Sequence, residues 1–171
     1  VTGVQTCALP ISPDGRLAML CEQKADGSVY YSLNLGSRNI IRPSSLGMRL
    51  AKPELMLNHF TLLSVDSARI DETWNPVWGE ESAIRNNCRE LTVRLQDASG
   101  SGVRMNIIFR IFNDGLGFRY EFPEQKDLNH FIVAEEKTQF AFAGDHKTFW
   151  IPGDYDTNEY GYHTCSLSED R

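Results

Sequence analysis

Oxygen-bearing side chains recur in the segment DYDTNEYGYHTC, and oxygen ligands are the ones that calcium prefers. Asp154, Asp156 and Asn158 take the first, third and fifth places of the calcium-binding loop that joins two helices. The sixth place of such a loop requires glycine and the twelfth a bidentate glutamate, but Glu159 and Cys165 stand there. The segment is therefore not a loop of that type, although its oxygen donors remain available for other chemistry.

Aromatic side chains are interleaved with these donors. Tyr155, Tyr160 and Tyr162 lie within the segment, and Trp150 precedes it. Because sugars stack on aromatic faces and calcium binds hard oxygens, one interpretation is a carbohydrate cleft beside a metal ion. The other is an acidic surface loop with packed tyrosines, and composition alone leaves both open.

Two pairs of adjacent glutamates could suggest general acid and base catalysis. They occur in Gly79–Glu81 (GEE) and in Ala134–Lys137 (AEEK). Both pairs are expected on strands, where neighbouring side chains point to opposite faces, so neither pair can converge on one substrate atom. The sequence also lacks a Gly-x-Ser-x-Gly elbow and a phosphate-binding glycine loop, so it does not indicate catalysis within this chain.

Histidine and cysteine spacing does not indicate a metal centre. The histidines are dispersed without metal-ligand spacing, which favours surface or turn positions: His59, His130, His146 and His163. Apart from Cys7, the cysteines stand at wide, irregular intervals: Cys21, Cys88 and Cys165. Neither a disulfide framework nor a zinc site follows from this pattern.

The candidate side chains must be positioned by strands, because the sequence consists of short runs of alternating apolar and polar residues separated by turn signals. The runs at 15–23 and 28–35 flank the turn KADG, and the runs at 90–97 and 103–112 flank ASGSG. An Asn-Asp-Gly turn then leads to 117–122, which predicts a three-stranded antiparallel meander. Further strands are expected at 131–144 and 147–152, so the predicted fold is an all-β antiparallel sandwich.

Composition excludes two classes of partner. The chain has 171 residues, which predicts one domain able to bury a core, and a formal net charge of −6. Nucleic acid is not an expected partner, because binding phosphates requires a basic face. No apolar run approaches the roughly 18 residues of a membrane span, so we expect none.

The opening residues VTGVQTCALPIS differ from the rest in carrying no charged side chain. They lack the basic region, apolar core and cleavage site of a targeting segment. Val1–Ile11 matches the translation of a common short-read sequencing adapter. We therefore interpret this segment as non-native and the chain as a metagenomic fragment. This interpretation predicts that the segment is extended or irregular, buries few side chains and makes no specific packing with the sandwich.

Several longer stretches resemble the N-terminal domain of glycoside hydrolase family 97, the bacterial α-glucosidases and α-galactosidases. The resemblance covers Ser12–Arg171 and rests on Ser12–Leu17 (SPDGRL), Ser44–Leu50 (SSLGMRL), Glu72–Leu95, Ile107–Gln125 and Glu135–Phe142 (EEKTQFAF). It implies a galactose-mutarotase-like β-supersandwich at 12–171, truncated at both ends. It also implies that the catalytic (β/α)₈ barrel of the same chain, with its catalytic residues, is absent from this fragment.

Function follows from the same resemblance. It implies a calcium-dependent, exo-acting α-glycosidase on α-linked glycans or oligosaccharides, periplasmic or secreted, whose N-terminal domain shapes the substrate cleft. The segment Asn158–Asp170 resembles the one that gives a glutamate to the Ca²⁺ ion, with Glu159 in the glutamate place. Cys165 and Cys88 depart from the family pattern. The alternatives are a free-standing carbohydrate-binding sandwich and a purely structural module.

Overall fold

The computed structural model describes residues 3–126, 128–153, 155–156 and 159–169, without the side chains of Val4 and Thr6. The chain divides into two compact units, Val1–Ala141 and Phe142–Arg171. Each unit is described by itself below.

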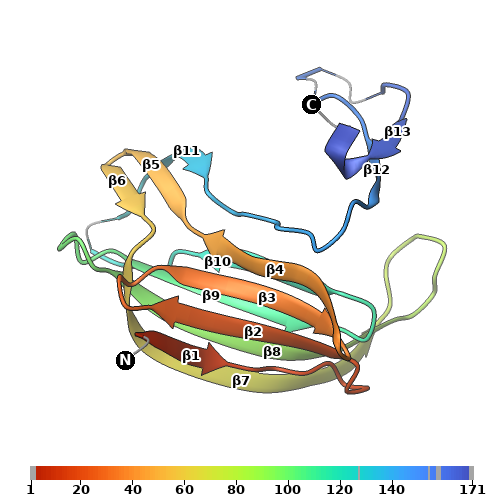
Figure 1. Ribbon diagram of the computed structural model, residues 1–171, viewed down its shortest axis with the longest axis horizontal. Helices are drawn as coiled ribbons and strands as arrows, with labels where there is room; N and C mark the ends of the chain where they lie inside the picture. Colours follow the sequence, from red (N-terminus) through yellow and green to blue (C-terminus); the bar gives the residue numbers. More distant parts are fainter. Residues whose placement is uncertain (1–2, 127, 154, 157–158, 170–171) are drawn as a thin grey trace. The chain divides into compact units, whose positions relative to one another are not determined.

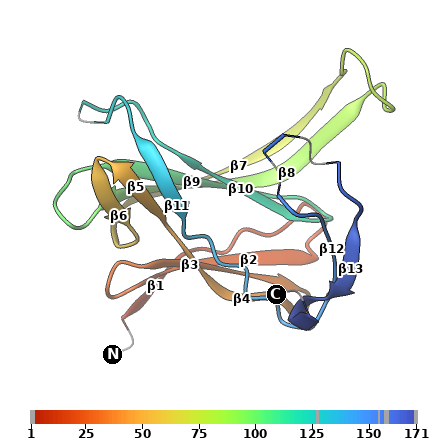
Figure 2. The same ribbon diagram turned by 90° about the horizontal axis from the view of Figure 1, so that it is seen from above.

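The described residues of the first unit form eleven strands in three antiparallel sheets. The strands are β1 (Val4–Ala8), β2 (Leu17–Lys24), β3 (Val29–Leu35), β4 (Arg38–Leu46), β5 (Met48–Lys52), β6 (Glu54–Leu57), β7 (Phe60–Trp74), β8 (Ile84–Asp97), β9 (Arg104–Ile111), β10 (Leu116–Glu121) and β11 (Ile132–Glu136). Two sheets have four strands, in the orders β1-β2-β3-β4 and β10-β9-β8-β7, and the third has the order β11-β5-β6. Figure 1 shows this arrangement, and Figure 2 shows the two larger sheets as separate layers.

The core lies between these two layers and confirms the predicted sandwich. Alternate residues of β2 are buried, as the period of a half-buried strand requires. Tyr31 on β3 meets Phe109 on β9 and Phe118 on β10, with ring centroids 6.3 and 5.3 Å apart. The other large, fully buried side chains come from both layers and, for Leu50 and Leu57, from the third sheet: Met19, Leu50, Leu57, Leu91, Leu95, Met105, Ile107, Ile111, Val29 and Val93.

The predicted turns connect the expected strands. The KADG turn joins β2 to β3, which pair from Leu17↔Leu35 to Gln23↔Val29. Gly27 in this turn has φ of 85°, and a Cβ there would lie 2.7 Å from the Phe60 carbonyl oxygen, so both the conformation and the space require glycine. The meander β8–β9–β10 is confirmed, with β7 added at its edge.

The strand expected at 131–144 is shorter than predicted. Regular pairing of β11 with β5 ends at Glu136. Beyond it the chain follows β4 through separate backbone bonds, in which the Gln139 amide donates to the Ser45 carbonyl and the Arg42 amide to the Ala141 carbonyl. Their spacing does not build a continuous ladder, so the alternating pattern of this stretch overpredicts the strand.

Strand β1 contradicts one expectation about the opening segment. It pairs with β2 from Val4↔Lys24 to Ala8↔Cys21, with a register shift between Thr6 and Ala8, so the prediction of no specific packing is wrong. None of the side chains described between Gly3 and Ile11 is fully buried, as expected, although Cys7 and Ala8 touch the core. The pairing weighs against the adapter interpretation. Backbone pairing is nevertheless open to any extended segment, so the origin of the segment stays a prediction.

The second unit is a small hairpin. It contains β12 (Lys147–Trp150), β13 (His163–Ser166) and a 3₁₀ turn, η1 (Leu167–Glu169). The strands pair from Lys147↔Ser166 to Trp150↔His163. None of the residues described in this unit is buried, so the hairpin has no apolar core of its own.

Candidate functional site

Glu159 lies in the loop that joins β12 to β13, and it is exposed. Tyr155 and Asp156, in the same loop, are exposed too. Two other residues of the calcium-like pattern, Asp154 and Asn158, lie outside the described residues. The expected exposure of Glu159 is confirmed, whereas its role as a metal ligand stays a prediction.

Contacts between β12 and β13 lie at the base of this loop. Trp150 stacks on His163, directly opposite, with ring centroids 4.6 Å apart and planes 21° apart. The Thr148 hydroxyl donates to the Cys165 carbonyl oxygen at 3.1 Å. Such cross-strand pairs are the contacts that stabilise a hairpin, and here they lie on the two strands that carry the loop.

The far end of the hairpin is closed by Asp145. Its carboxylate accepts hydrogen bonds of 2.9 Å from the amide and from the hydroxyl of Ser168. Both bonds hold the pKa of Asp145 below its usual range, and the bond from the backbone amide contributes more than the bond from the hydroxyl. The Leu167 amide donates to the His146 carbonyl at 2.8 Å, so η1 is tied back to the start of the hairpin.

The tyrosines expected as a sugar platform are exposed, but Trp150 is not fully available. Tyr155, Tyr160 and Tyr162 all face solvent, as does Phe149. One face of Trp150 is covered by His163, and its buried indole nitrogen finds no hydrogen-bond partner among the described residues. The unit therefore presents exposed aromatic side chains in the same loop as the exposed Asp156 and Glu159.

The described residues supply donors of the right type for calcium but too few of them. Across the described residues, no group of three or more His, Cys, Asp or Glu side chains could hold a metal ion. Glu159 can offer carboxylate oxygens, whereas a calcium site uses about six to eight oxygen ligands. These residues fit one corner of a calcium site, and the remaining ligands would have to come from elsewhere.

The paired glutamates do not form a catalytic dyad. Glu135 accepts a hydrogen bond from Lys137 at 2.6 Å, which lowers its pKa, while Glu136 accepts one from Thr138 at 2.6 Å. Glu80 and Glu81 lie in the loop between β7 and β8, so placing them on a strand was wrong. Exposed positions in an open loop do not hold two carboxylates across a substrate, and the conclusion that they are poor dyads is unchanged.

The Cys7 and Cys21 thiols are hydrogen-bonded to each other, a contact that their spacing in the sequence does not indicate. His59 contacts Asn58 and, at 3.8 Å, Asp26, and His163 stacks on Trp150. The cysteines are free thiols, with Cys21 and Cys88 buried. Burial raises the pKa of the Cys88 thiol, which disfavours the reactive thiolate.

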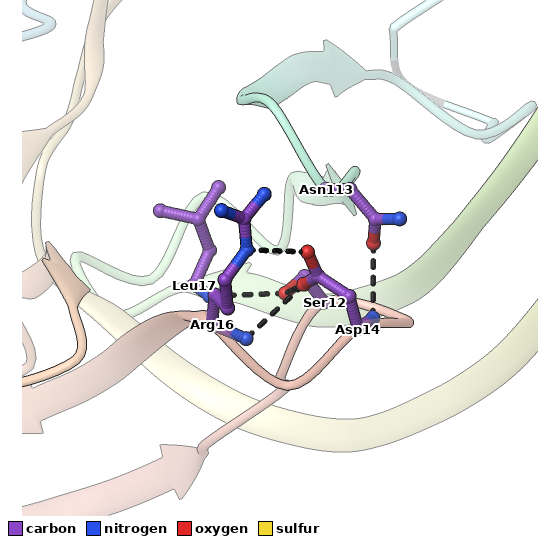
Figure 3. A network of polar contacts seen from close by, with 5 residues as sticks. All are labelled: Ser12, Asp14, Arg16, Leu17 and Asn113. Carbon is purple, nitrogen blue, oxygen red and sulfur yellow. Dashed lines mark hydrogen bonds and ion pairs between the residues drawn. The ribbon is translucent and has the colours of Figure 1, made fainter.

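One polar network was not foreseen from the sequence. Figure 3 shows Asp14 between the hydroxyl of Ser12, at 2.7 Å, and the Arg16 guanidinium, also at 2.7 Å. The amide of Asp14 donates to Asn113 at 3.0 Å, so the SPDG turn is joined to the NDGL turn between β9 and β10. The Ser12 bond and then the Arg16 bond lower the pKa of Asp14 to about 2. Asp14 is therefore an ionised acceptor that ties two turns together, and it has no proton to give near neutral pH.

An open cavity of about 710 Å³ lies beside this network. Its walls are residues 9–15, Ser67–Arg69, Arg89 and Glu90. Arg69 and Arg89 are opposite each other on β7 and β8, and Asp71 lies 3.7 Å from Arg69. Part of the wall belongs to the segment interpreted as non-native, so we assign the cavity no function.

Fold and side chains together define an antiparallel β-sandwich domain. The family model described as Glycosyl-hydrolase 97 N-terminal matches residues 11–171. The chain belongs to glycoside hydrolase family 97, and it corresponds to the N-terminal region of that family.

Similar proteins agree with this assignment. The retaining alpha-galactosidase of Bacteroides thetaiotaomicron is 26% identical over 170 residues, which is 92% of this chain and 24% of that protein. A family 97 enzyme from Pseudoalteromonas sp. strain K8, solved with acarbose, has a TM-score of 0.82 and 28% identity, over 95% of this chain and 25% of that one. A variant of the Pseudoalteromonas enzyme, solved with panose, has a TM-score of 0.80 and 29% identity, over 92% and 24% of the two chains. This chain thus spans about a quarter of the length of the relatives it matches.

None of the helices in the described part of the chain is long and apolar enough to cross a membrane.

Proposed function

We propose that this chain is the non-catalytic N-terminal domain of a calcium-dependent, exo-acting α-glycosidase, which shapes the substrate cleft and gives one ligand to the metal. The observation that carries the proposal is the family match across residues 11–171, in a chain about a quarter as long as the enzymes it matches. The substrate class would be an α-linked glycan or oligosaccharide, and the compartment the periplasm or the exterior of the cell. Catalysis would belong to a (β/α)₈ barrel further along the same polypeptide.

The distribution of carboxylates supports this division of labour. Glycoside hydrolysis generally uses two carboxyl groups on opposite sides of the scissile bond, about 5–10 Å apart. The adjacent glutamates at 135 and 136 are engaged with Lys137 and Thr138, and those at 80 and 81 lie in an exposed loop. A catalytic pair supplied by another part of the polypeptide is consistent with this arrangement.

Position and chemistry support Glu159 as the metal ligand. The side chain is an exposed carboxylate in the loop between β12 and β13. A single carboxylate contributes oxygen ligands and negative charge to an ion held mainly by other groups. When bound, the calcium ion would supply electrostatic stabilisation beside the substrate.

Calcium titration of the full-length protein encoded by the same gene tests this proposal. Glu159→Gln keeps the shape of the side chain and removes its charge, so we expect calcium affinity to fall by about tenfold or more. The matched control is Glu124→Gln, which neutralises another exposed glutamate, outside the hairpin, and should leave affinity unchanged. Equal calcium affinity in wild type and Glu159→Gln would refute the assignment of Glu159.

Exposed aromatic residues favour a second candidate, a free-standing carbohydrate-binding module. Phe149 is 65% exposed, and Tyr155 and Tyr162 are exposed as well. Affinity electrophoresis of the 171-residue chain in gels containing soluble α-glucan separates the two functions. Retardation that is lost in Tyr162→Ala would support the module, whereas unretarded migration would favour the domain of a larger enzyme.

A further inference from the structure

Strands β7 and β8 continue beyond the sheet to which they belong. They pair with each other along their whole length, from Phe60↔Asp97 to Trp74↔Ile84. β9 joins β8 only from Arg89 onward, opposite Ile111. Residues 70–88 therefore form a two-stranded arm without a third strand, which we call the projecting ribbon, and Figure 2 shows it extending past β9 and β10.

Polar pairs run along the strands of the projecting ribbon. Arg85 donates two hydrogen bonds to Asp71, at 2.9 and 3.0 Å, and Asn86 donates one to Glu72 at 2.9 Å. All of these pairs are open to solvent, where such contacts contribute little. A two-stranded hairpin is marginally stable in water, so these pairs alone do not account for a fixed arm.

The tip of the projecting ribbon, residues 74–83, carries three uncovered apolar side chains ahead of Glu80 and Glu81. Val77 is 99% exposed, Trp78 88% and Trp74 51%. Gly79 follows with φ of 142°, a conformation that favours glycine and turns the chain directly after Trp78. Clustered exposed apolar side chains with a polar surround are typical of protein interaction sites, and tryptophan is enriched among residues that dominate binding.

We propose that the tip of the projecting ribbon docks into an apolar pocket on the part of the polypeptide that lies outside this chain in full-length family 97 enzymes. About three quarters of each matched relative lies outside the matched region, so an occupant of the required size belongs to the same polypeptide. The apolar tip with paired polar groups behind it has the anatomy of an interface, with a dry centre and a hydrated rim. The inference rests on the proposed function only in that this chain is part of a longer enzyme, and it does not depend on calcium or on Glu159.

Two other occupants fit the tip less well. A sugar would find stacking faces on Trp78 and Trp74, but it would gain neither stacking nor a hydrogen bond from Val77, the most exposed of the three side chains. A second copy of the chain, tip against tip, would bring its Glu80 and Glu81 next to the same two carboxylates of the first copy, and like charges repel. A pocket of different sequence avoids both problems.

Hydroxyl-radical footprinting read by mass spectrometry tests the proposal. It compares the 171-residue chain with the full-length protein encoded by the same gene, with a reference peptide in each sample to normalise dose. Trp78 is 88% exposed in the chain, and burial in a dry pocket predicts that its oxidation falls by about tenfold in the full-length protein. Equal oxidation of Trp78 in the two proteins overturns the proposal.

A pair of variants gives an independent measurement. Trp78→Ala should leave the Tm of the 171-residue chain unchanged, because the side chain has no cover there, and lower the Tm of the full-length protein. The matched control is Leu63→Ala, which truncates an exposed side chain of β7 outside the projecting ribbon and should change neither Tm. An unchanged Tm for Trp78→Ala in the full-length protein contradicts docking.

The remaining outcomes assign a different occupant or separate the two proposals. Protection of Trp78 in the chain alone as its concentration rises, with dimers seen by light scattering, would show a second copy and overturn the proposal. Protection only on adding maltoheptaose would show a sugar and also overturn it. A full-length protein with protected Trp78 but no α-glycosidase activity would refute the proposed function and support docking. A full-length protein with α-glycosidase activity but exposed Trp78 would support the proposed function and refute docking of the tip.

Discussion

Aromatic side chains are used differently in the two units of the chain. In the first, Tyr31, Phe109 and Phe118 contact one another inside the sandwich. In the second, Phe149 and Tyr162 face solvent, and none of the described residues is buried. Burial of apolar surface is the main favourable term in folding, so the first unit carries the stability of the chain. The second unit presents side chains at its surface without a core to support them.

Hydrogen exchange should show the largest contrast between the units. Amides of β9 are expected to exchange through global unfolding, whereas those of β12 and β13 need only local opening. We expect protection in the two regions to differ by about a thousandfold or more, measured by mass spectrometry of peptides from the intact chain. Similar protection in both regions would break the comparison, because it would mean that the hairpin is as stably folded as the sandwich.

Truncating one aromatic side chain in each unit sharpens the comparison. Phe109→Ala removes a fully buried ring and should lower the free energy of unfolding by about 3–5 kcal/mol. Phe149→Ala removes a ring that is 65% exposed and should change it by less than about 0.5 kcal/mol. Urea denaturation followed by circular dichroism measures both, and a large loss from Phe149→Ala would show that the second unit has hidden packing.

Removing the hydroxyl of Tyr31 should lower the free energy of unfolding by a smaller amount, and this loss should depend on pH. It donates a hydrogen bond of 2.9 Å to the Gln139 carbonyl, so Tyr31→Phe should cost about 0.5–1.5 kcal/mol near neutral pH.

Burial, with a smaller contribution from Tyr120, raises the pKa of Tyr31 to about 12. A raised pKa means that this stabilisation is complete below the pKa of the unfolded chain, about 10, and is lost as pH rises toward 12. Wild type should therefore lose more stability than Tyr31→Phe across this range, measured by urea denaturation at several pH values. Identical slopes would contradict the burial of the phenol.

Replacing Asp145 should have the smallest effect of these changes, an increase in hydrogen exchange that is confined to the second unit. Hydrogen bonds from Ser168 lower its pKa, so its contribution is present above the pKa of the unfolded chain, about 4, and is lost as pH falls through the lowered value. Asp145→Asn should speed hydrogen exchange in η1 by a few-fold at neutral pH and leave exchange in β9 unchanged. The matched control is Asp156→Asn, on an exposed loop position of the same unit. An effect of Asp145→Asn on β9 would show that the two units unfold together.

Alternation in the sequence predicted strands where at least one face is buried, and it failed where that condition does not hold. β2, β8 and β10 pack one face on the core, whereas β9 and part of β3 are buried on both faces. The runs and turns of all five strands were predicted. β7 was not expected as a strand, because most of its side chains are exposed and its outer half belongs to the projecting ribbon. A strand that is exposed on both faces has no period of two for the sequence to display.

The candidate site was predicted in part for a related reason. Composition drew attention to the segment around Glu159, and its exposure follows from a loop rich in polar residues. The bond from Asp14 to Asn113 joins residues 99 positions apart, and no local pattern specifies such a pairing. The prediction that Glu80 and Glu81 lie on a strand was wrong, because two adjacent glutamates do not distinguish a strand from a loop in the sequence.

Strand β1 bears on how the sandwich avoids aggregation. A sheet edge with unpaired amides and carbonyls is a template for another chain, and proteins protect such edges with a covering segment, with charge or with a bulge. β1 covers one side of β2 through backbone bonds, and its described side chains are only partly buried or exposed. Any extended peptide could make those bonds, including a purification tag or a strand from a neighbouring molecule. The segment before Ser12 thus decides whether the edge of β2 is covered within one molecule or is left open to pair with a strand of another molecule.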